Sequence, residues 1–151
     1  MQDSGMLKTE VFNLAAAGRI SARCGELAAA RKYFEKNLLI GPHYSGWVKI
    51  SYARLLARMQ LFDKTLAFTA KYRDSEFSIE SSKLAMQLFR AYALAKQNKP
   101  QQTKKLIDNI LTQSGPQQNK RFFERTLSSA QDSDFIYGVI NTLETFGFEN
   151  S

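Results

Sequence analysis

The residues best suited to chemistry in this chain are cations that stand four positions apart. Arg19 and Arg23 form one such pair, Arg54 and Arg58 form a second, and each pair has an alanine directly before its second member. Side chains at this spacing lie on one face of a helix, where two like charges destabilise the helix by about 0.2–0.5 kcal/mol. The planar guanidinium group binds a carboxylate or a phosphate through two parallel hydrogen bonds. The pairs therefore predict a surface that compensates its own repulsion by binding anionic groups.

Residues that could support catalysis are few. His43 is the only histidine, and it follows Pro42 in a predicted turn. Cys24 is the only cysteine; it has no histidine nearby in the sequence, and we expect it to be a small buried residue at a helix end. No glycine-rich phosphate loop, pair of catalytic carboxylates or Ser/His/Asp set can be assembled. We therefore predict a protein that is not an enzyme, with no catalytic residues, no cofactor and no metal site.

Composition predicts one all-α domain. The 151 residues carry a net charge of +7, which favours an acidic partner of some kind. Three prolines and eight glycines leave long uninterrupted stretches rich in helix-forming residues. The length suits a single domain over residues 6–147. No run of 18 apolar residues is present, so we predict no membrane span. A single cysteine and a polar start unlike a signal peptide predict a cytoplasmic location.

Helical spacing of apolar residues, interrupted by glycine, proline and short polar connections, predicts eight helices. Their expected spans are Met6 to Cys24, Glu26 to Ile40, Trp47 to Met59, Leu61 to Tyr72, Ser78 to Asn98, Pro100 to about Thr112, Gln117 to Ala130, and a last one from Asp132 or Ser133 to near Gly147.

Small residues recur at a spacing of twelve positions, first at Gly18 and Ala30. The other clear pairs are Ala53 with Thr65 and Ala91 with Thr103, and a weaker one is Thr126 with Gly138. Together with Gly25, Phe34 and Pro42, this pattern resembles the tetratricopeptide repeat, a helix–turn–helix unit of about 34 residues. The resemblance covers roughly residues 11–115 and extends weakly to residue 147. Several consensus positions are occupied by other residues, such as Ser21 where the family has a tyrosine.

The resemblance implies an α-solenoid of about three units, residues 6–42, 45–73 and 78–115, followed by a capping helix pair over 117–147. It also implies a concave groove lined by the first helix of each unit. On that register the groove contains the two arginine pairs and a third pair with the same spacing, Tyr92 and Lys96. Phe12 and Trp47 fall at the groove edge as expected aromatic anchors. Alanines at positions 22, 57 and 95 would let an extended chain approach the helices closely.

The predicted function is that of an adaptor or scaffold whose basic groove binds an acidic or C-terminal peptide segment of another protein. Two other functions stay open: a helical repeat that binds nucleic acid, and a small secretion-type chaperone. Self-association through the C-terminal helices, with Phe146 and Phe148 as a docking edge, is a further alternative. The arginines could instead pair within the fold, with Glu10, Glu26, Asp63 or Glu80 as the available partners.

Overall fold

The computed structural model describes residues 4–40, 46–71, 80–114 and 133–148, and every regular element in these ranges is an α-helix. The predicted all-α class is therefore confirmed for the described part of the chain. The predicted helix from Gln117 to Ala130 lies outside the described residues. The seven helices are α1 (Ser4–Arg23), α2 (Leu27–Ile40), α3 (Gly46–Arg58), α4 (Phe62–Lys71), α5 (Glu80–Lys96), α6 (Pro100–Ser114) and α8 (Ser133–Glu144).

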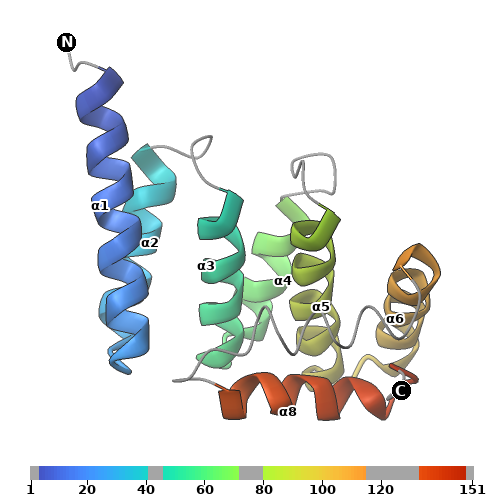
Figure 1. Cartoon of the computed structure of the whole chain (residues 1–151). Helices are drawn as coiled ribbons and strands as arrows, with labels where there is room; N and C mark the ends of the chain where they lie inside the picture. The colour runs from blue at the N-terminus through green and yellow to red at the C-terminus, as the bar shows by residue number, and fades with distance from the viewer. Residues whose placement is uncertain (1–3, 41–45, 72–79, 115–132, 149–151) are drawn as a thin grey trace.

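The first six helices stand side by side as three successive pairs, which is the arrangement that Figure 1 shows. Within the pairs, α1 packs against α2, α3 against α4, and α5 against α6. Between the pairs, α3 contacts both α1 and α2, while α5 contacts both α3 and α4. Consequently α3 lies between α1 and α5, so the three helices that contain the predicted binding residues are neighbours.

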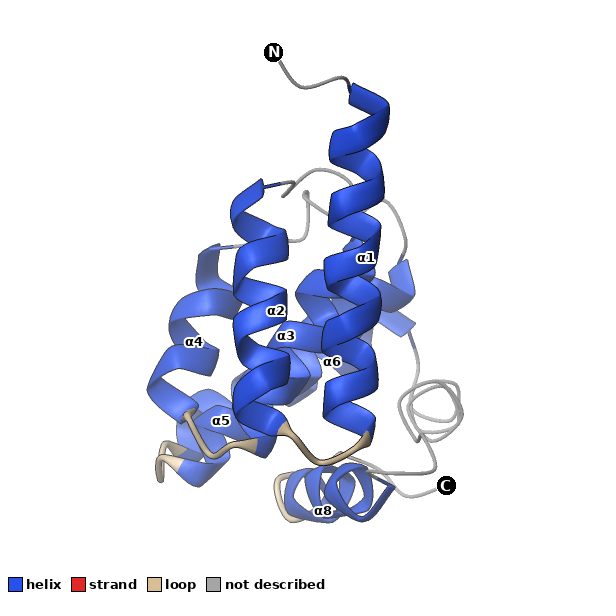
Figure 2. Ribbon diagram, turned by 90° about the vertical axis from the view of Figure 1, so that its left-hand side faces the viewer, coloured by secondary structure: helices blue, strands red, loops and turns tan. Residues whose placement is uncertain are grey.

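The last helix, α8, does not continue this row. It crosses the lower ends of the upright helices in Figure 1, and Figure 2 shows it nearly end-on at the bottom of the molecule. Its main packing partner is α5. In the weak twelve-residue pair, a Cβ added at Gly138 would meet no atom within 4 Å, so Gly138 marks no close approach of another described helix. Thr126 lies outside the described residues.

Small buried residues explain how the helices of a pair approach each other. A Cβ added at Gly18 of α1 would lie 2.7 Å from the Phe34 ring of α2, so only glycine fits there. Both threonines of the pattern donate a hydrogen bond from the side-chain hydroxyl to the carbonyl oxygen four residues back, that of Leu61 for Thr65 and that of Lys99 for Thr103, which satisfies the buried hydroxyl. Apart from Gly18, the residues of the three clear pairs are all fully buried: Ala30, Ala53, Thr65, Ala91 and Thr103.

The three turns inside the pairs share one backbone geometry. A residue with positive φ stands seven positions after the small residue of each first helix: Gly25 (φ 78°), Gln60 (φ 62°) and Asn98 (φ 58°). In each turn this residue donates its N–H to the carbonyl three positions back, and the next residue donates to the carbonyl five positions back. This is the hydrogen-bond pattern with which a left-handed residue ends an α-helix. The repetition predicted from small residues is thus present in the turns as well.

Two hydrophobic clusters hold the row together. The first joins the first and second pairs and includes Phe34, Val48, Leu55 and Leu56. The second, larger cluster joins α3, α5, α6 and α8 and includes the fully buried Phe89 of α5. Here the Phe89 ring stacks on Phe135 of α8 with 6.5 Å between ring centroids. This contact packs α8 against α5, the helix that contains the predicted binding residues Tyr92 and Lys96.

Candidate binding face

The first predicted pair is open to solvent. Arg19 and Arg23 are both exposed at the C-terminal half of α1, and neither has an ion-pair or hydrogen-bond partner among the residues that the structure describes. Phe12, whose side chain is 69% exposed, stands seven positions before Arg19 and therefore lies on the same helix face. This face of α1 combines two cations with an aromatic ring, and it provides the groups that an acidic segment with apolar side chains would contact.

The second pair is partly used by the fold. Arg54 and Arg58 are both half-buried on α3. Arg58 donates a hydrogen bond from Nη1 to the carbonyl oxygen of Ala22, 3.1 Å away in the last turn of α1. The C-terminal carbonyls of a helix carry partial negative charge, which favours a cation at this place. The partner of Arg58 is thus a backbone carbonyl on the neighbouring helix, whereas a carboxylate was the expected partner within the fold.

The third pair differs most from the prediction. Tyr92 is only 9% exposed, because Phe62 of α4 and Phe135 of α8 enclose its ring, with centroid distances of 5.9 and 5.7 Å. Burial raises the pKa of its phenol. Lys96 is exposed and places Nζ 5.6 Å from the centre of the Tyr92 ring, a cation–π geometry. At α5, therefore, only the lysine of the pair faces solvent.

The remaining predicted groove residues are Trp47 and the alanines at positions 22, 57 and 95. Trp47 belongs to α3, but its side chain lies outside the described part. Ala57 is buried in the larger cluster and offers no surface to a peptide, so the expected close approach at this position is wrong. Ala22 and Ala95 are half-buried.

Polar contacts that the sequence did not indicate hold the helices behind this face. Tyr52 of α3 donates to Glu35 Oε2 of α2 at 2.8 Å, and Arg31 lies 3.4 Å from the same carboxylate oxygen. Burial, followed by the hydrogen bond to Glu35, raises the pKa of Tyr52 to about 12. On the next pair, Arg90 of α5 donates from Nη1 to the carbonyl oxygen of Leu66, 3.0 Å away in α4. The contacts of Tyr52 and Arg90 each join the first helix of one pair to the second helix of the pair before it, whereas Arg31 and Glu35 both belong to α2.

Two expectations about isolated residues are corrected. Cys24 is exposed rather than buried, because it stands just after the last residue of α1 and outside the helix–helix contact. Phe148 is fully buried in the larger cluster, and Phe146 packs against that cluster, so the proposed C-terminal docking edge is wrong for Phe148. His43 lies outside the described residues.

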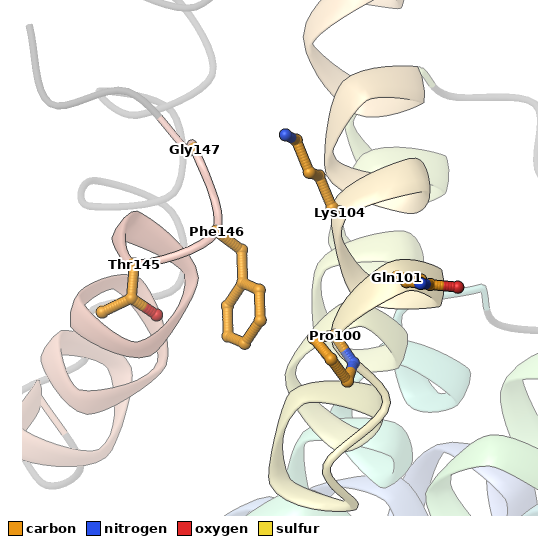
Figure 3. A pocket seen from close by; sticks show the side chains of 6 residues that line it. All are labelled: Pro100, Gln101, Lys104, Thr145, Phe146 and Gly147. Carbon is orange, nitrogen blue, oxygen red and sulfur yellow. The ribbon is translucent and has the colours of Figure 1, made fainter.

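A pocket lies between the first turn of α6 and the end of α8 (Figure 3). In Figure 3 the Phe146 ring stands between the two elements, and the Lys104 side chain extends toward the same space. Lys104 is the one charged residue among those that line the pocket, and no carboxylate or imidazole faces it. The six lining residues are Pro100, Gln101, Lys104, Thr145, Phe146 and Gly147. This donor set favours neither acid–base chemistry nor metal binding.

A metal site, a membrane span or similarity to known proteins would each point to a function. Among the described residues, no group of three His, Cys, Asp or Glu side chains could hold a metal ion. None of the described helices is long and apolar enough to cross a membrane. Comparison with known proteins found no matching family model, no matching curated sequence and no matching solved structure.

Proposed function

We propose that this chain is a tetratricopeptide-like interaction module, not an enzyme, and that it binds an acidic segment of another protein. The fold assignment is supported by three helix pairs, three turns of one geometry and the buried small residues at a spacing of twelve. A row of such pairs presents its first helices on one side, where successive units contribute to one binding surface.

One observation supports the binding role above all others: Arg19 and Arg23 are exposed, adjacent on one face and unpaired within the described chain, beside an exposed Phe12. An acidic segment would pair with the two guanidinium groups, and its apolar side chains would cover the ring. Arg54 and Lys96 continue the positive charge along α3 and α5, and Trp47 is a second aromatic anchor in this proposal. Arg58 contributes charge while it donates its hydrogen bond to α1, and Tyr92 contributes the cation–π contact to Lys96.

The test is a paired capture from lysate of the source cells, with and without nuclease. The bait is either the natural chain or the variant Arg19→Glu with Arg23→Glu. These positions are chosen because both side chains are exposed and neither has a polar partner among the described residues, so charge reversal should leave the melting temperature nearly unchanged. We expect the natural chain alone to capture a protein with an acidic segment, whether or not nuclease is present.

A matched control reverses an equally spaced pair of exposed lysines elsewhere. Lys32→Glu with Lys36→Glu makes the same change of charge on α2, and we expect it to retain the captured protein. If capture disappears with nuclease, the chain binds nucleic acid instead, and its affinity would then fall by about one log unit per log unit of salt for each phosphate contact. If the arginine variant captures the same proteins as the natural chain, the proposed face is not the binding surface.

A further inference from the structure

The exposed side of α1 corresponds to surfaces that are covered on the other two first helices. Ile20 of α1 is 61% exposed, whereas the residues at the same repeat position, Leu55 of α3 and Ala93 of α5, are buried. Phe12 behaves in the same way, since its counterpart on α5 is the buried Ala85. Leu55 is buried because it packs into the cluster shared with the first pair.

The chain also contains an example of a helix that docks on this side of a first helix. On α5, Phe89 and Tyr92 receive Phe135 of α8. The repeat positions of Phe89 and Tyr92 are occupied on α1 by Ala16 and Arg19. The docked helix contains Asp134 and Glu144 and no lysine or arginine. An apolar helix with acidic ends is therefore the type of ligand that this molecule already binds on one of its own first helices.

We infer that the face of α1 formed by Phe12, Ala16, Arg19, Ile20 and Arg23, here called the α1 face, binds an acidic amphipathic helix of a partner protein. The inference rests on the proposed function and adds the conformation and the chemistry of the ligand. Apolar side chains of the partner helix would cover Phe12 and Ile20, and its carboxylates would pair with the two arginines. From Phe12 to Arg23 the α1 face is about 16 Å long, at 1.5 Å per residue, which matches about three turns of a partner helix.

Charge argues for a different protein and against a second copy of this chain. A symmetric dimer through the α1 face would place Arg19 and Arg23 of both copies in one interface. Both copies also carry a net charge of +7. Like charges at such an interface oppose association, whereas an acidic helix meets the face with complementary charge.

The probe is a capped, fluorescently labelled peptide with the sequence of α8, Ser133 to Glu144, which has one acidic residue near each end. We expect it to bind the full chain in a fluorescence anisotropy titration and to gain helical circular dichroism on binding. Phe12→Ser with Ile20→Ser should weaken binding by at least about tenfold, a loss typical of interface anchors. Arg19→Glu with Arg23→Glu should weaken it similarly, and added salt, which weakens binding to the natural chain, should no longer do so, because it screens the new repulsion between carboxylates.

Two controls separate this site from others. Leu39→Ser removes an even more exposed apolar side chain from α2, and Lys32→Glu with Lys36→Glu reverses two charges there; both should change the affinity by less than about twofold. If the peptide binds equally well to the α1 variants, it occupies another surface, such as that of the resident α8, and the inference fails. Absence of binding to the natural chain has the same meaning.

A second peptide, with Ile140→Pro, tests the conformation of the ligand. Proline in the middle of a helix costs roughly 3 kcal/mol, so this peptide should bind far more weakly if the bound form is helical. Equal binding of the two peptides would contradict the proposal that the ligand binds as a helix. It would not contradict the proposal that the ligand is an acidic segment. Failure of the proposed function would appear differently, as identical capture from lysate by the natural chain and the arginine variant.

Discussion

Arg58 of α3 and Ala22 of α1 are joined by a hydrogen bond of 3.1 Å from the guanidinium Nη1 to the backbone carbonyl oxygen. The same carbonyl accepts the N–H of Gly25 at 3.1 Å, in the turn that ends α1. The Arg58 side chain of α3 thus contacts the last turn of α1, next to the turn that connects α1 to α2. Arg58 therefore makes a contact between helices, whereas Arg19 and Arg23 are exposed and have no partner among the described residues.

Removal of this contact should cost stability. We expect Arg58→Ala to lower the free energy of unfolding by about 1–2 kcal/mol, since a hydrogen bond from a charged donor contributes about 1.5–3 kcal/mol and the half-buried site reduces this. Urea denaturation measures the loss. Arg23→Ala is the control: its side chain is exposed and unpaired among the described residues, so its effect should stay within about 0.5 kcal/mol. Equal effects of the two changes would contradict a stabilising role for Arg58.

The two helical glycines at Gly18 and Gly138 should respond to alanine with opposite signs. At Gly18 a new Cβ would lie 2.7 Å from the buried Phe34 ring, and we expect a net loss of about 1–2 kcal/mol, because overpacking outweighs the gain in helix propensity. At Gly138 nothing lies within 4 Å of a new Cβ, so alanine should stabilise the protein by about 0.5–1 kcal/mol. Thermal melts of the two variants measure both effects. A stabilised Gly18→Ala variant would show that α1 and α2 are not in close contact there.

Left-handed turn residues allow a similar comparison. Gly25 has φ 78° and open space around a new Cβ, so Gly25→Ala should cost about 1 kcal/mol through backbone strain alone. Gln60 has φ 62° and already carries that strain. Gln60→Gly should therefore leave stability unchanged or raise it by up to about 1 kcal/mol. Urea midpoints give the ordering, and a Gln60→Gly variant less stable than the natural chain would contradict the strain at this turn.

The helices and their pairing could be predicted from the sequence because both depend on local regularities. Apolar spacing marks each helix, and a spacing of twelve is the distance between two positions that face each other across a tight turn. The sequence does not identify the other two turns as equivalents of the turn at Gly25, because Gln60 and Asn98 adopt the left-handed conformation without being glycine. Asparagine tolerates this conformation through its short polar side chain, and no sequence pattern marks the glutamine.

The exposure of the candidate site residues could be predicted only where it depends on a single helix. The face that joins Phe12, Arg19 and Arg23 follows from helical spacing, and their side chains are exposed as expected. The burial of Tyr92 depends on Phe135, far along the chain on a helix that leaves the row. The partner of Arg58 is a backbone carbonyl, which every residue possesses, so residue types alone cannot single it out.

The hydrogen bond between Tyr52 and Glu35 predicts how stability depends on pH. The ordinary pKa of the Tyr52 phenol is 10.0, and in the folded protein the pKa is about 12. The rise comes first from burial and then from the hydrogen bond that the phenol donates to Glu35. Between these values the unfolded chain loses the proton while the folded chain keeps it. The contribution of Tyr52 to stability is therefore complete below pH 10 and is lost as the pH rises toward 12.

Urea midpoints at pH 8, 10 and 11 test this dependence in the natural chain and in Tyr52→Phe. At pH 8 the variant should be less stable by about 1 kcal/mol, the contribution of one hydrogen bond. Its stability should then fall less steeply than that of the natural chain between pH 10 and 11, because phenylalanine has no proton to lose. Tyr33→Phe is the control, since Tyr33 is exposed on α2, and it should retain the natural slope. Parallel slopes for the natural chain and Tyr52→Phe would mean that the phenol ionises as readily in the folded protein as in the unfolded chain, and that the contact to Glu35 does not hold its proton.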